Sequence, residues 1–502
     1  MEDIQFENEV DNKVFDIIVV GAGVAGSAFA YSLGKAGKRV LCIERDLSEP
    51  DRIVGELMQP GGVKALRELG MEDCLDGIDS SLVFGYGIFK QGKGTKLSYP
   101  KDSNGAIING FSFHHGRFIQ KLRLKASSCE NVFMVEGTVS SLIEEDGIIK
   151  GVTYIESKKK DTSNNENKEN SDENNSSNNN NNTTGTNKDI INEVRAPLTV
   201  VCDGCFSNLR KALVPENQPL LTSTFVGLII KGVQLPFQCH GHVFLVDPAP
   251  ILMYRIGSDE IRVLVDIPFK CPPNSELKEY LETVTAPQLP ESLRESFLYA
   301  LRNSPLKKMP NSRLPPNPTP KPGVLMIGDS WNMRHPLTGS GMTVCLSDCV
   351  ILSKLITQSQ PSINFTDRVS MEKLLQKFTT QRKPLASTLN VLAGALYKVF
   401  SASNEHLRKA CLGYLSLGGE FSAGPVALLS GLKPKPHILA MHFFAVAFYG
   451  VIKNIFPFPT PARIRRCFQI LCAASDIVVP LLRSEGVLKY IQNICIILRL
   501  TK

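Results

Sequence analysis

Residues 15–45 read FDIIVVGAGVAGSAFAYSLGKAGKRVLCIER, and this stretch decides the fold of the chain. The β-branched run at 17–20 indicates a strand, and the pattern G-x-G-x-x-G follows it at Gly21, Gly23 and Gly26. In a strand–turn–helix unit these glycines permit a tight turn, let the backbone approach a pyrophosphate and allow the helix to pack closely on the strand. The helix N-terminus offers amide donors and partial positive charge to phosphates. The stretch therefore predicts a Rossmann unit that binds a dinucleotide.

A second strand and an acid complete this unit. Lys38–Ile43 is expected to form the strand, and Glu44 follows it. A carboxylate roughly 20 residues beyond the glycines takes a ribose hydroxyl of the adenosine half in such units. Arg45 and Arg52 in the next loop are candidates for the phosphates of the cofactor, and two solvated loop arginines are the alternative.

The composition is that of an ordinary globular protein. The chain has 502 residues, of which 43% are hydrophobic and 21% are charged, so two or three domains are expected. A net charge of +7 at this length gives no argument for nucleic acid as a partner. Thirteen cysteines are scattered along the chain, which predicts reduced, buried thiols rather than disulfides or zinc sites. The acidic, polar opening of the chain predicts no signal peptide, so the catalytic part is expected to face the cytosol.

Two further aspartates suggest which dinucleotide is bound. Asp203 and Asp329 each follow a strand that reads as buried, and an apolar helix opens at Met342. Because the carboxyl ends of parallel strands meet at one edge of a sheet, both turns are expected to reach the same elongated ligand as the glycine turn. Asp329 would accept hydrogen bonds from ribityl hydroxyls, and the positive end of the helix would face a flavin ring. A helix-capping turn is the alternative role for Asp329.

These three loops favour FAD over NAD, since an NAD enzyme would not need the second and third. The chain contains no second G-x-G-x-x-G, so we expect no NADPH-binding unit within it. The adjacent histidines of FHHGRF at 113–118 cannot share a helix face, and no metal site is expected there. Arg117 on the leading turn of the following helix is the residue of interest in that segment.

The expected fold class is α/β, with a Rossmann-type FAD-binding domain, a β-rich substrate domain and a C-terminal helical membrane-associated region. The FAD-binding domain is expected in three parts, at 14–156, 189–222 and 311–360. The other expected segments are the substrate domain at 223–310, a helical region at 361–432 and membrane-associated helices at 433–502. An Asn-rich insert at 157–188 has no apolar content, so it is expected to be a disordered, overgrown hairpin loop.

The C-terminal tail is both basic and apolar. From Lys433 onward ten Lys or Arg residues accompany only two acids, which suits an anionic membrane surface. The apolar run His437–Ile452 has sixteen residues, whereas a full span needs about 20. Two later runs, at 467–482 and 487–500, are interrupted by charges. We expect helices that lie in one leaflet or on the interface; a buried bundle is the alternative, and a full span is the least favoured.

Five longer strings are typical of one enzyme family. They are ERDLSEPDRIVGE at 44–56, QPGG at 59–62, FHHGRF at 113–118, NMRHPLTGSGMT at 332–343 and LRKACLGYLSLGGE at 407–420. By these strings the chain resembles the squalene monooxygenases, or squalene epoxidases, over nearly its whole length apart from the first dozen residues and the Asn-rich insert. The resemblance implies FAD, molecular oxygen, squalene as a membrane-embedded lipid substrate, and electrons from the NADPH-dependent cytochrome reductase of the endoplasmic reticulum.

The resemblance also implies site residues. The family's FAD contacts fall on Val24, Ala25, Glu44, Arg45, Arg52, Arg117, Val139, Asp329 and Met342, with Asp203 in an aspartate–glycine turn. Tyr86 matches the family's active-site tyrosine, and Gln59 matches the glutamine that partners it. A core aromatic is the alternative for Tyr86. Ser340 and the pair Ser330-Trp331 depart from the family pattern and are candidates for altering the pocket wall.

The implied reaction converts squalene, oxygen and reduced FAD to (S)-2,3-epoxysqualene, a step of sterol biosynthesis. An alkene needs an electrophilic oxygen, which a flavin C4a-hydroperoxide supplies, so the protein's task is to orient the terminal double bond and exclude water. The expected location is the cytosolic face of the endoplasmic reticulum membrane, with lipid droplets as a second location. Attachment is expected through the tail, because the long N-terminal membrane segment of some relatives is not found.

Two other classes of function are compatible with these residues. One is a different FAD-dependent hydroxylase or a prenyl-lipid reductase of similar fold. The other is a non-enzymatic prenyl-lipid carrier that shares the architecture but holds no flavin. The presence of Glu44, Arg117 and Asp329 argues against the carrier.

Overall fold

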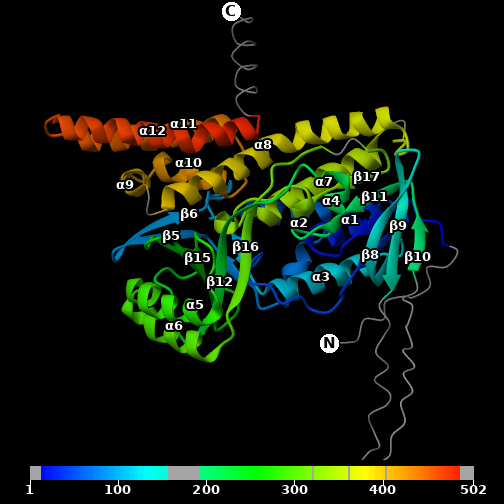
Figure 1. Cartoon of the computed structure of the whole chain (residues 1–502), viewed down its shortest axis with the longest axis horizontal. Helices are drawn as coiled ribbons and strands as arrows, with labels where there is room; N and C mark the ends of the chain where they lie inside the picture. The colour runs from blue at the N-terminus through cyan, green and yellow to red at the C-terminus, as the bar shows by residue number, and fades with distance from the viewer. Residues whose placement is uncertain (1–12, 157–190, 319–320, 360–361, 402–403, 487–502) are drawn as a thin grey trace, which may run out of the picture.

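A computed structural model describes residues 13–156, 191–318, 321–359, 362–401 and 404–486 (Figure 1). Its first sheet has seven strands in the order β10-β9-β8-β2-β1-β11-β17. The strands from β8 to β17 are parallel to one another, whereas β9 and β10 are antiparallel additions at the edge. Their bounds are β1 (Ile17–Val20), β2 (Val40–Glu44), β8 (Val132–Glu145), β9 (Ile148–Glu156), β10 (Ile191–Arg195), β11 (Leu198–Val201) and β17 (Val324–Met326).

The predicted Rossmann unit is confirmed at the centre of this sheet. The four residues of β1 are all buried, as a β-branched strand in a parallel sheet requires. Helix α1 packs tightly against it, because a Cβ on Gly26 would lie 1.7 Å from the carbonyl oxygen of Gly21. The other helices of this part are α2 (Pro60–Leu69), α3 (His115–Ser127), α4 (Asn208–Leu213) and α7 (Gly341–Gln358), with α1 at Val24–Lys35.

The strands on both sides of the Asn-rich insert pair with each other. β9 and β10 are antiparallel neighbours, and Ile155 lies opposite Ile191. The strand pattern therefore resumes after the insert as the sequence predicted. The insert itself, at 157–188, lies outside the described residues.

A second seven-stranded sheet has the order β16-β12-β15-β14-β13-β5-β6. β13 pairs in parallel with β5, so β5 and β6 belong to this sheet and not to the FAD-binding domain, where the boundaries 14–156 had placed them. The sequence did not indicate this pairing, because β13 lies more than 150 residues after β5. The bounds are β5 (Gly85–Lys90), β6 (Lys93–Ser98), β12 (Leu220–Lys231), β13 (Gly241–Phe244), β14 (Ile251–Arg255), β15 (Glu260–Ile267) and β16 (Lys307–Arg313).

The two faces of the second sheet carry different residues because side chains alternate along a strand. On β15, Val263 and Val265 pack under α5 (Asn274–Tyr280) and α6 (Glu291–Asn303). Leu264 belongs to the cluster on the opposite face. That second face lies toward the first sheet. A small sheet of β3 (Leu57–Met58), β7 (Gly110–Ser112) and β4 (Ser81–Val83) lies beside them.

Five helices complete the described chain and lie together along one side of the molecule (Figure 1). They are α8 (Arg368–Phe400), α9 (Glu405–Leu415), α10 (Glu420–Leu429), α11 (Pro436–Ile455) and α12 (Pro461–Ser484). α11 and α12 are long and apolar enough to cross a membrane by length and composition. The prediction that this segment is too short for a full span was therefore wrong. Helix α11 has 20 residues, because it extends beyond the apolar run in both directions.

A buried ion pair joins the first part of the chain to the second sheet. Glu56, just before β3, accepts two hydrogen bonds from Arg262 of β15, both at 2.8 Å, and the two side chains are 0% and 4% exposed. Tyr254 of β14 donates a third hydrogen bond to the same carboxylate at 3.3 Å. Removing one partner of such a pair leaves a charge without compensation in a medium of low polarity.

We therefore expect Glu56→Ala to lower the free energy of unfolding by about 3–5 kcal/mol, measured by chemical denaturation. Glu68→Ala is the matched control, because Glu68 pairs with Lys354 at 3.1 Å on the surface. That variant should lose at most about 1 kcal/mol. Equal losses in the two variants would contradict the structural role of the buried pair.

Candidate active site

One cavity of about 580 Å³ lies between the two large sheets. The first sheet contributes the ends of β1 and β2, residues of β8 and the turns that follow β11 and β17, and the second contributes residues of β5, β13, β14, β15 and β16. Of the residues singled out in the sequence, Gly21, Gly23, Val24, Ala25, Glu44, Arg45, Arg52, Tyr86, Val139, Asp203, Asp329 and Met342 line this cavity. Gly26, Gln59 and Arg117 are not part of its wall.

The three glycines of the first turn have three different surroundings. Gly21 has a φ of +96°, which a residue with a side chain rarely adopts. A Cβ on Gly23 would meet no atom of the described chain within 4 Å, so the backbone faces open cavity there. Gly26 lies beneath the turn, in the close contact of α1 with β1. The N-cap Gly23 provides no side-chain cap, so the first amides of α1, at Val24 and Ala25, open into the cavity.

Glu44 is held at the end of β2 by the backbone of the glycine turn. Its Oε2 accepts a hydrogen bond from the Ala22 amide at 2.6 Å. Arg123 lies beside it: Nη2 is 3.7 Å from the same oxygen, Nε donates to the Ala22 carbonyl at 3.0 Å, and Nη1 donates to the Ser48 carbonyl at 3.0 Å. Burial lowers the pKa of Arg123, and the Glu44 carboxylate opposes that shift.

Arg117 does not occupy the position that the sequence analysis gave it. Its side chain is 41% exposed and lies 3.8 Å from Asp79, outside the cavity wall. Arg123, six residues later on α3, lines the cavity instead. Six residues turn a helix by about 240°, so the two arginines face different directions. A signal was present in the sequence, because Arg123 lies four residues after the buried Ile119 and hence on the buried face.

Asp203 and Asp329 lie at the ends of neighbouring strands, as predicted, and both line the cavity. Burial raises the pKa of each carboxyl group. The guanidinium groups of Arg334, Arg52 and Arg210 oppose this shift at Asp329. Oδ1 of Asp203 is buried and has no hydrogen-bond partner among the described residues. This part of the cavity therefore offers carboxylate acceptors beside a group of fixed positive charges.

A second helix N-terminus opens into the same region. α7 begins at Gly341, its N-cap Ser340 provides no side-chain cap, and a Cβ on Gly341 would meet no described atom within 4 Å. Met342 in its first turn lines the cavity, as does Val139 of β8.

The structure brings Tyr86 and Gln59 into contact. The amide nitrogen of Gln59 donates to the Tyr86 hydroxyl and, at 2.6 Å, to the Thr338 carbonyl. Tyr99, which the sequence analysis missed, donates from its hydroxyl to Oε1 of Gln59 at 2.6 Å. Burial raises the pKa of Tyr86 and raises that of Tyr99 well above its usual range, so both hydroxyls stay protonated. Tyr86 lies on the cavity wall, and Gln59 is fully buried behind it.

Apolar side chains form another part of the wall. Leu57, Leu252, Leu264, Met309 and Leu337 surround the part of the cavity beyond Tyr86. The hydroxyl of Tyr254, which also lines this part, is engaged with Glu56. This half of the cavity is therefore suited to an apolar molecule without a polar group of its own.

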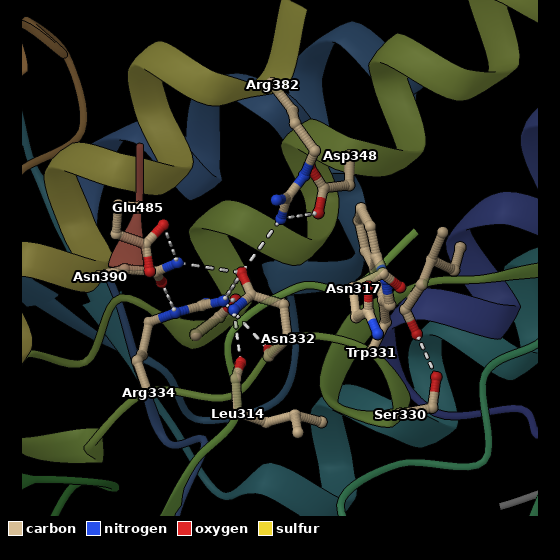
Figure 2. Close-up of polar contacts among 12 residues, drawn as sticks. Leu314, Asn317, Ser330, Trp331, Asn332, Arg334, Asp348, Arg382, Asn390 and Glu485 are labelled. Atoms are coloured by element: carbon tan, nitrogen blue, oxygen red, sulfur yellow. Dashed lines mark hydrogen bonds and ion pairs between the residues drawn. The ribbon is translucent and has the colours of Figure 1, made fainter. Parts of the chain in front are cut away.

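Three residues that depart from the family pattern do not line the cavity: Ser330, Trp331 and Ser340. Trp331 donates from Nε1 to the Asn317 carbonyl at 2.7 Å (Figure 2). Its ring stacks on that of Phe378 of α8. Ser340 is buried, and its hydroxyl is 2.9 Å from that of Thr338.

The polar half of the cavity fits an FAD molecule. The same cavity is lined by two helix N-termini without side-chain caps, by the open space at Gly23 and Gly341, and by Asp203 with its unpartnered oxygen. Amides at a helix N-terminus bind phosphate, and carboxylates at strand ends bind sugar hydroxyls.

Comparison with known proteins supports this geometry. Residues 195–467 match the family model described as squalene epoxidase, and residues 19–48 match an NAD(P)-binding Rossmann-like domain. Squalene epoxidase 2, mitochondrial, of Arabidopsis thaliana is 50% identical over 96% of this chain and 77% of its own length. Squalene monooxygenase of Mus musculus is 40% identical over 95% of this chain and 79% of its own length.

Solved structures of flavoproteins share the fold. The flavin-dependent brominase Bmp2 has a TM-score of 0.62 at 15% identity and covers 87% of this chain and 99% of its own. HpxO of Klebsiella pneumoniae, complexed with FAD, has a TM-score of 0.61 at 16% identity, over 83% of this chain and 99% of its own. Identities this low show the architecture alone. The family match and the relatives at 40–50% identity show more: the chain belongs to the squalene epoxidase family.

Proposed function

We propose that this protein is an FAD-dependent monooxygenase that converts squalene and oxygen to (S)-2,3-epoxysqualene in sterol biosynthesis. Membership of the squalene epoxidase family supports this reaction. The observation that carries it in the structure is the division of one cavity into a polar half and an apolar half that meet at Tyr86. A dinucleotide fits the first half, and a long hydrocarbon fits the second.

In the polar half, each group has a task that follows from its chemistry. The first turn of α1 binds the pyrophosphate, and Glu44 binds a ribose hydroxyl. Asp329 accepts hydrogen bonds from the ribityl chain, and the N-terminus of α7 favours negative charge at the flavin ring. Arg123 ties the Ala22 carbonyl to the Ser48 carbonyl and so fixes the glycine turn. Bound FAD supplies the redox and oxygen chemistry.

In the apolar half, the chain selects and orients squalene by shape. Squalene has no polar group, so apolar contact and the form of the walls must place its terminal double bond. The same walls exclude water from the reacting atoms. The Glu56–Arg262 pair lies behind Tyr254, where each charge is neutralised by the other, so the wall in front of it remains apolar.

Gln59 and Tyr86 stand where the two halves meet. Gln59 contacts Tyr86, Tyr99 and Thr338 at once, so the orientation of its amide group is determined by three partners. The fixed amide in turn sets the direction of the Tyr86 hydroxyl at the cavity wall. This arrangement supports a role for the pair in shaping the site next to the flavin.

The electron donor in this proposal is the NADPH-dependent cytochrome reductase of the endoplasmic reticulum. The chain carries a single G-x-G-x-x-G, which the FAD site uses. The proposed location is the cytosolic face of the endoplasmic reticulum membrane, with lipid droplets as a second location.

The α11–α12 hairpin is the proposed attachment to the membrane. Exposed apolar side chains follow one stripe of α11, continue through the turn and reach the start of α12: Met441, Phe448, Ile452, Phe456, Phe458, Ile464 and Phe468. Lys453, Arg465 and Arg466 are exposed beside them. The opposite face of α12, with Ile470, Ile477 and Leu481, packs into the protein. An apolar stripe flanked by basic residues suits a hairpin that lies in one leaflet of an anionic membrane.

The first prediction concerns flavin retention. Asp329→Ala should purify largely without flavin, and Arg123→Gln should raise the FAD dissociation constant about tenfold because it removes two hydrogen bonds that hold the glycine turn. Arg117→Gln is the matched control on the same helix and should bind FAD like the wild type. Fluorescence titration of the flavin-depleted proteins measures all three. Loss of FAD from Arg117→Gln, with normal binding by Arg123→Gln, would reverse our assignment.

The second prediction concerns the reaction itself. Purified wild-type protein with FAD, the reductase, NADPH, oxygen and squalene should form (S)-2,3-epoxysqualene, detected by chromatography and mass spectrometry. Tyr86→Phe should lower turnover about tenfold, because Gln59 loses one of its three partners, and should keep its flavin content. Tyr414→Phe, at a buried tyrosine hydrogen-bonded to His442, is the control and should turn over normally. No epoxide from the wild type would refute the proposed function, and unchanged turnover by Tyr86→Phe would leave that ring a packing role only.

The third prediction concerns the membrane. Replacing Phe456 and Phe458 together by glutamate should reduce binding to anionic liposomes about a hundredfold or more, because two exposed aromatic rings no longer enter the bilayer. Tyr299→Glu is the control, since Tyr299 is 72% exposed on α6, away from the hairpin. Flotation of the purified proteins with liposomes measures the effect. Equal flotation of the double variant and the wild type would place the attachment elsewhere.

A further inference from the structure

A buried polar cluster connects the flavin half of the cavity to the end of the C-terminal hairpin. Its members are Asn332 and Arg334, in the loop before α7, Asn390 of α8, and Glu485, the C-cap residue directly after α12 (Figure 2). We call these four residues the Arg334 cluster. Asn332, Asn390 and Glu485 are at most 9% exposed, and Arg334 lines the cavity.

Arg334 uses all three guanidinium nitrogens within the protein. Nε donates to Oδ1 of Asn390 at 2.7 Å, and Nη2 donates to the carbonyl and side-chain oxygens of Asn332 at 3.1 and 2.9 Å. Nη1 donates to the carbonyl of Gly341 at 3.2 Å. Gly341 is the first residue of α7, so Arg334 holds the helix N-terminus that opens into the cavity.

Asn390 connects Arg334 to Glu485 at the end of α12 through two hydrogen bonds. Its Oδ1 accepts from Arg334, while its Nδ2 donates to Oε2 of Glu485 and to Oδ1 of Asn332, both at 3.2 Å. The two ends of the amide cannot be exchanged, because a guanidinium group can only donate and a carboxylate can only accept. Glu485 therefore acts together with Arg334 and the Oδ1 of Asn332 to fix which way the Asn390 amide faces, and this orientation gives Arg334 its acceptor.

The packing of α8 against α12 brings these residues together. A Cβ on Gly394 would lie 2.9 Å from Cδ2 of Leu481, so the lack of a side chain there allows the close approach. Asn390 and Gly394 are four residues apart on α8, as are Leu481 and Glu485 along α12, so one turn of each element faces the other. Arg313 of β16 donates to the hydroxyl of Ser484 and secures the same end of α12.

Nearby positive charges stabilise the buried carboxylate of Glu485. Burial raises the pKa of Glu485, whereas the Asn390 hydrogen bond and the nearby Arg382, Arg313 and Arg334 oppose the shift. Asp348 of α7 takes two hydrogen bonds from Arg382, both at 2.9 Å, so that cation is already paired. Among the described residues Glu485 makes no ion pair, and its carboxylate accepts a hydrogen bond from the Asn390 amide.

We propose that Arg334 is a positioning residue for the flavin half of the cavity and that Asn390 and Glu485 hold it in place, so that productive flavin binding depends on the end of α12. This role rests on the proposed function, because it requires FAD in that half. The α11–α12 hairpin then serves the active site directly, in addition to its proposed membrane attachment. Arg334 acts through Gly341 and Asp329 and not on the reacting atoms.

The experiment compares Glu485→Ala, Glu485→Gln and Asp476→Ala in the full-length protein in detergent. Glu485→Ala should raise the FAD dissociation constant about tenfold, alter the visible circular dichroism of bound flavin, and lower kcat while the KM for squalene changes less than about twofold. Glu485→Gln retains an acceptor for Asn390 and should restore wild-type values. Asp476→Ala is the matched control, because it removes an exposed carboxylate from the same helix.

A double-mutant cycle then tests whether Asn390 carries the effect. If it does, adding Glu485→Ala to Asn390→Ala should weaken FAD binding by less than about twofold, since contacting residues in one network are not additive. Should Glu485→Ala fail to fold, Glu485→Asp, which withdraws the carboxylate by one methylene, takes its place in the cycle.

Three results would overturn the proposal. The first is a lower melting temperature of Glu485→Ala with unchanged FAD affinity and flavin spectrum, since the cluster would then be structural only. The second is failure of Glu485→Gln to restore binding, and the third is full additivity with Asn390→Ala. A wild-type protein that binds no FAD would instead refute the proposed function, so the two failures are distinguishable.

Discussion

The close contact of α1 with β1 is the constraint on which the site depends. Gly26 permits this contact, because any side chain there would overlap the Gly21 carbonyl. With α1 fixed, its first amides must lie at the carboxyl end of β1. The parallel strands β2, β11 and β17 end at the same edge and bring Glu44, Asp203 and Asp329 beside those amides. One packing contact thus places the groups of the polar half of the cavity.

The second sheet supplies what the first cannot, an apolar wall of fixed shape. Alternation along β14 and β15 points one set of side chains under α5 and α6 and the other set at the cavity. Charged residues on the cavity-facing side are paired behind the wall, as Arg262 is with Glu56. Gln59, buried between the sheets, makes hydrogen bonds to residues from three separate segments. The junction of the two halves is therefore rigid because its polar groups are mutually satisfied.

Local patterns in the sequence predicted the local parts of this structure. The Rossmann unit, the strands on both sides of the insert and the contact between Gln59 and Tyr86 could all be anticipated from motifs or from the family resemblance. Non-local pairing could not: β5 joins the second sheet through β13, and no periodicity in residues 85–90 indicates that partner. The prediction of Arg117 as a cavity residue was wrong because it followed the motif FHHGRF, which contains that arginine. The direction of the helix face decides which arginine reaches the cavity, and that one is Arg123. Arg334 stood inside a recognised string, but its partners Asn390 and Glu485 come from distant helices.

The C-terminal hairpin shows why such distant partners matter. Its outer stripe carries exposed phenylalanines, which suits a bilayer. Its inner face packs on α8, and the buried carboxylate of Glu485 follows its last turn. Burying a carboxylate without a directly paired cation costs free energy, and the nearby Arg382, Arg313 and Arg334 reduce that cost at Glu485. The hydrogen bond from Asn390 reduces the cost further, and the same amide accepts from Arg334, which contacts the start of α7. Glu485, Asn390 and Arg334 therefore form a chain of hydrogen bonds from the end of the hairpin to the first residue of α7, which is the physical link that the proposed coupling requires.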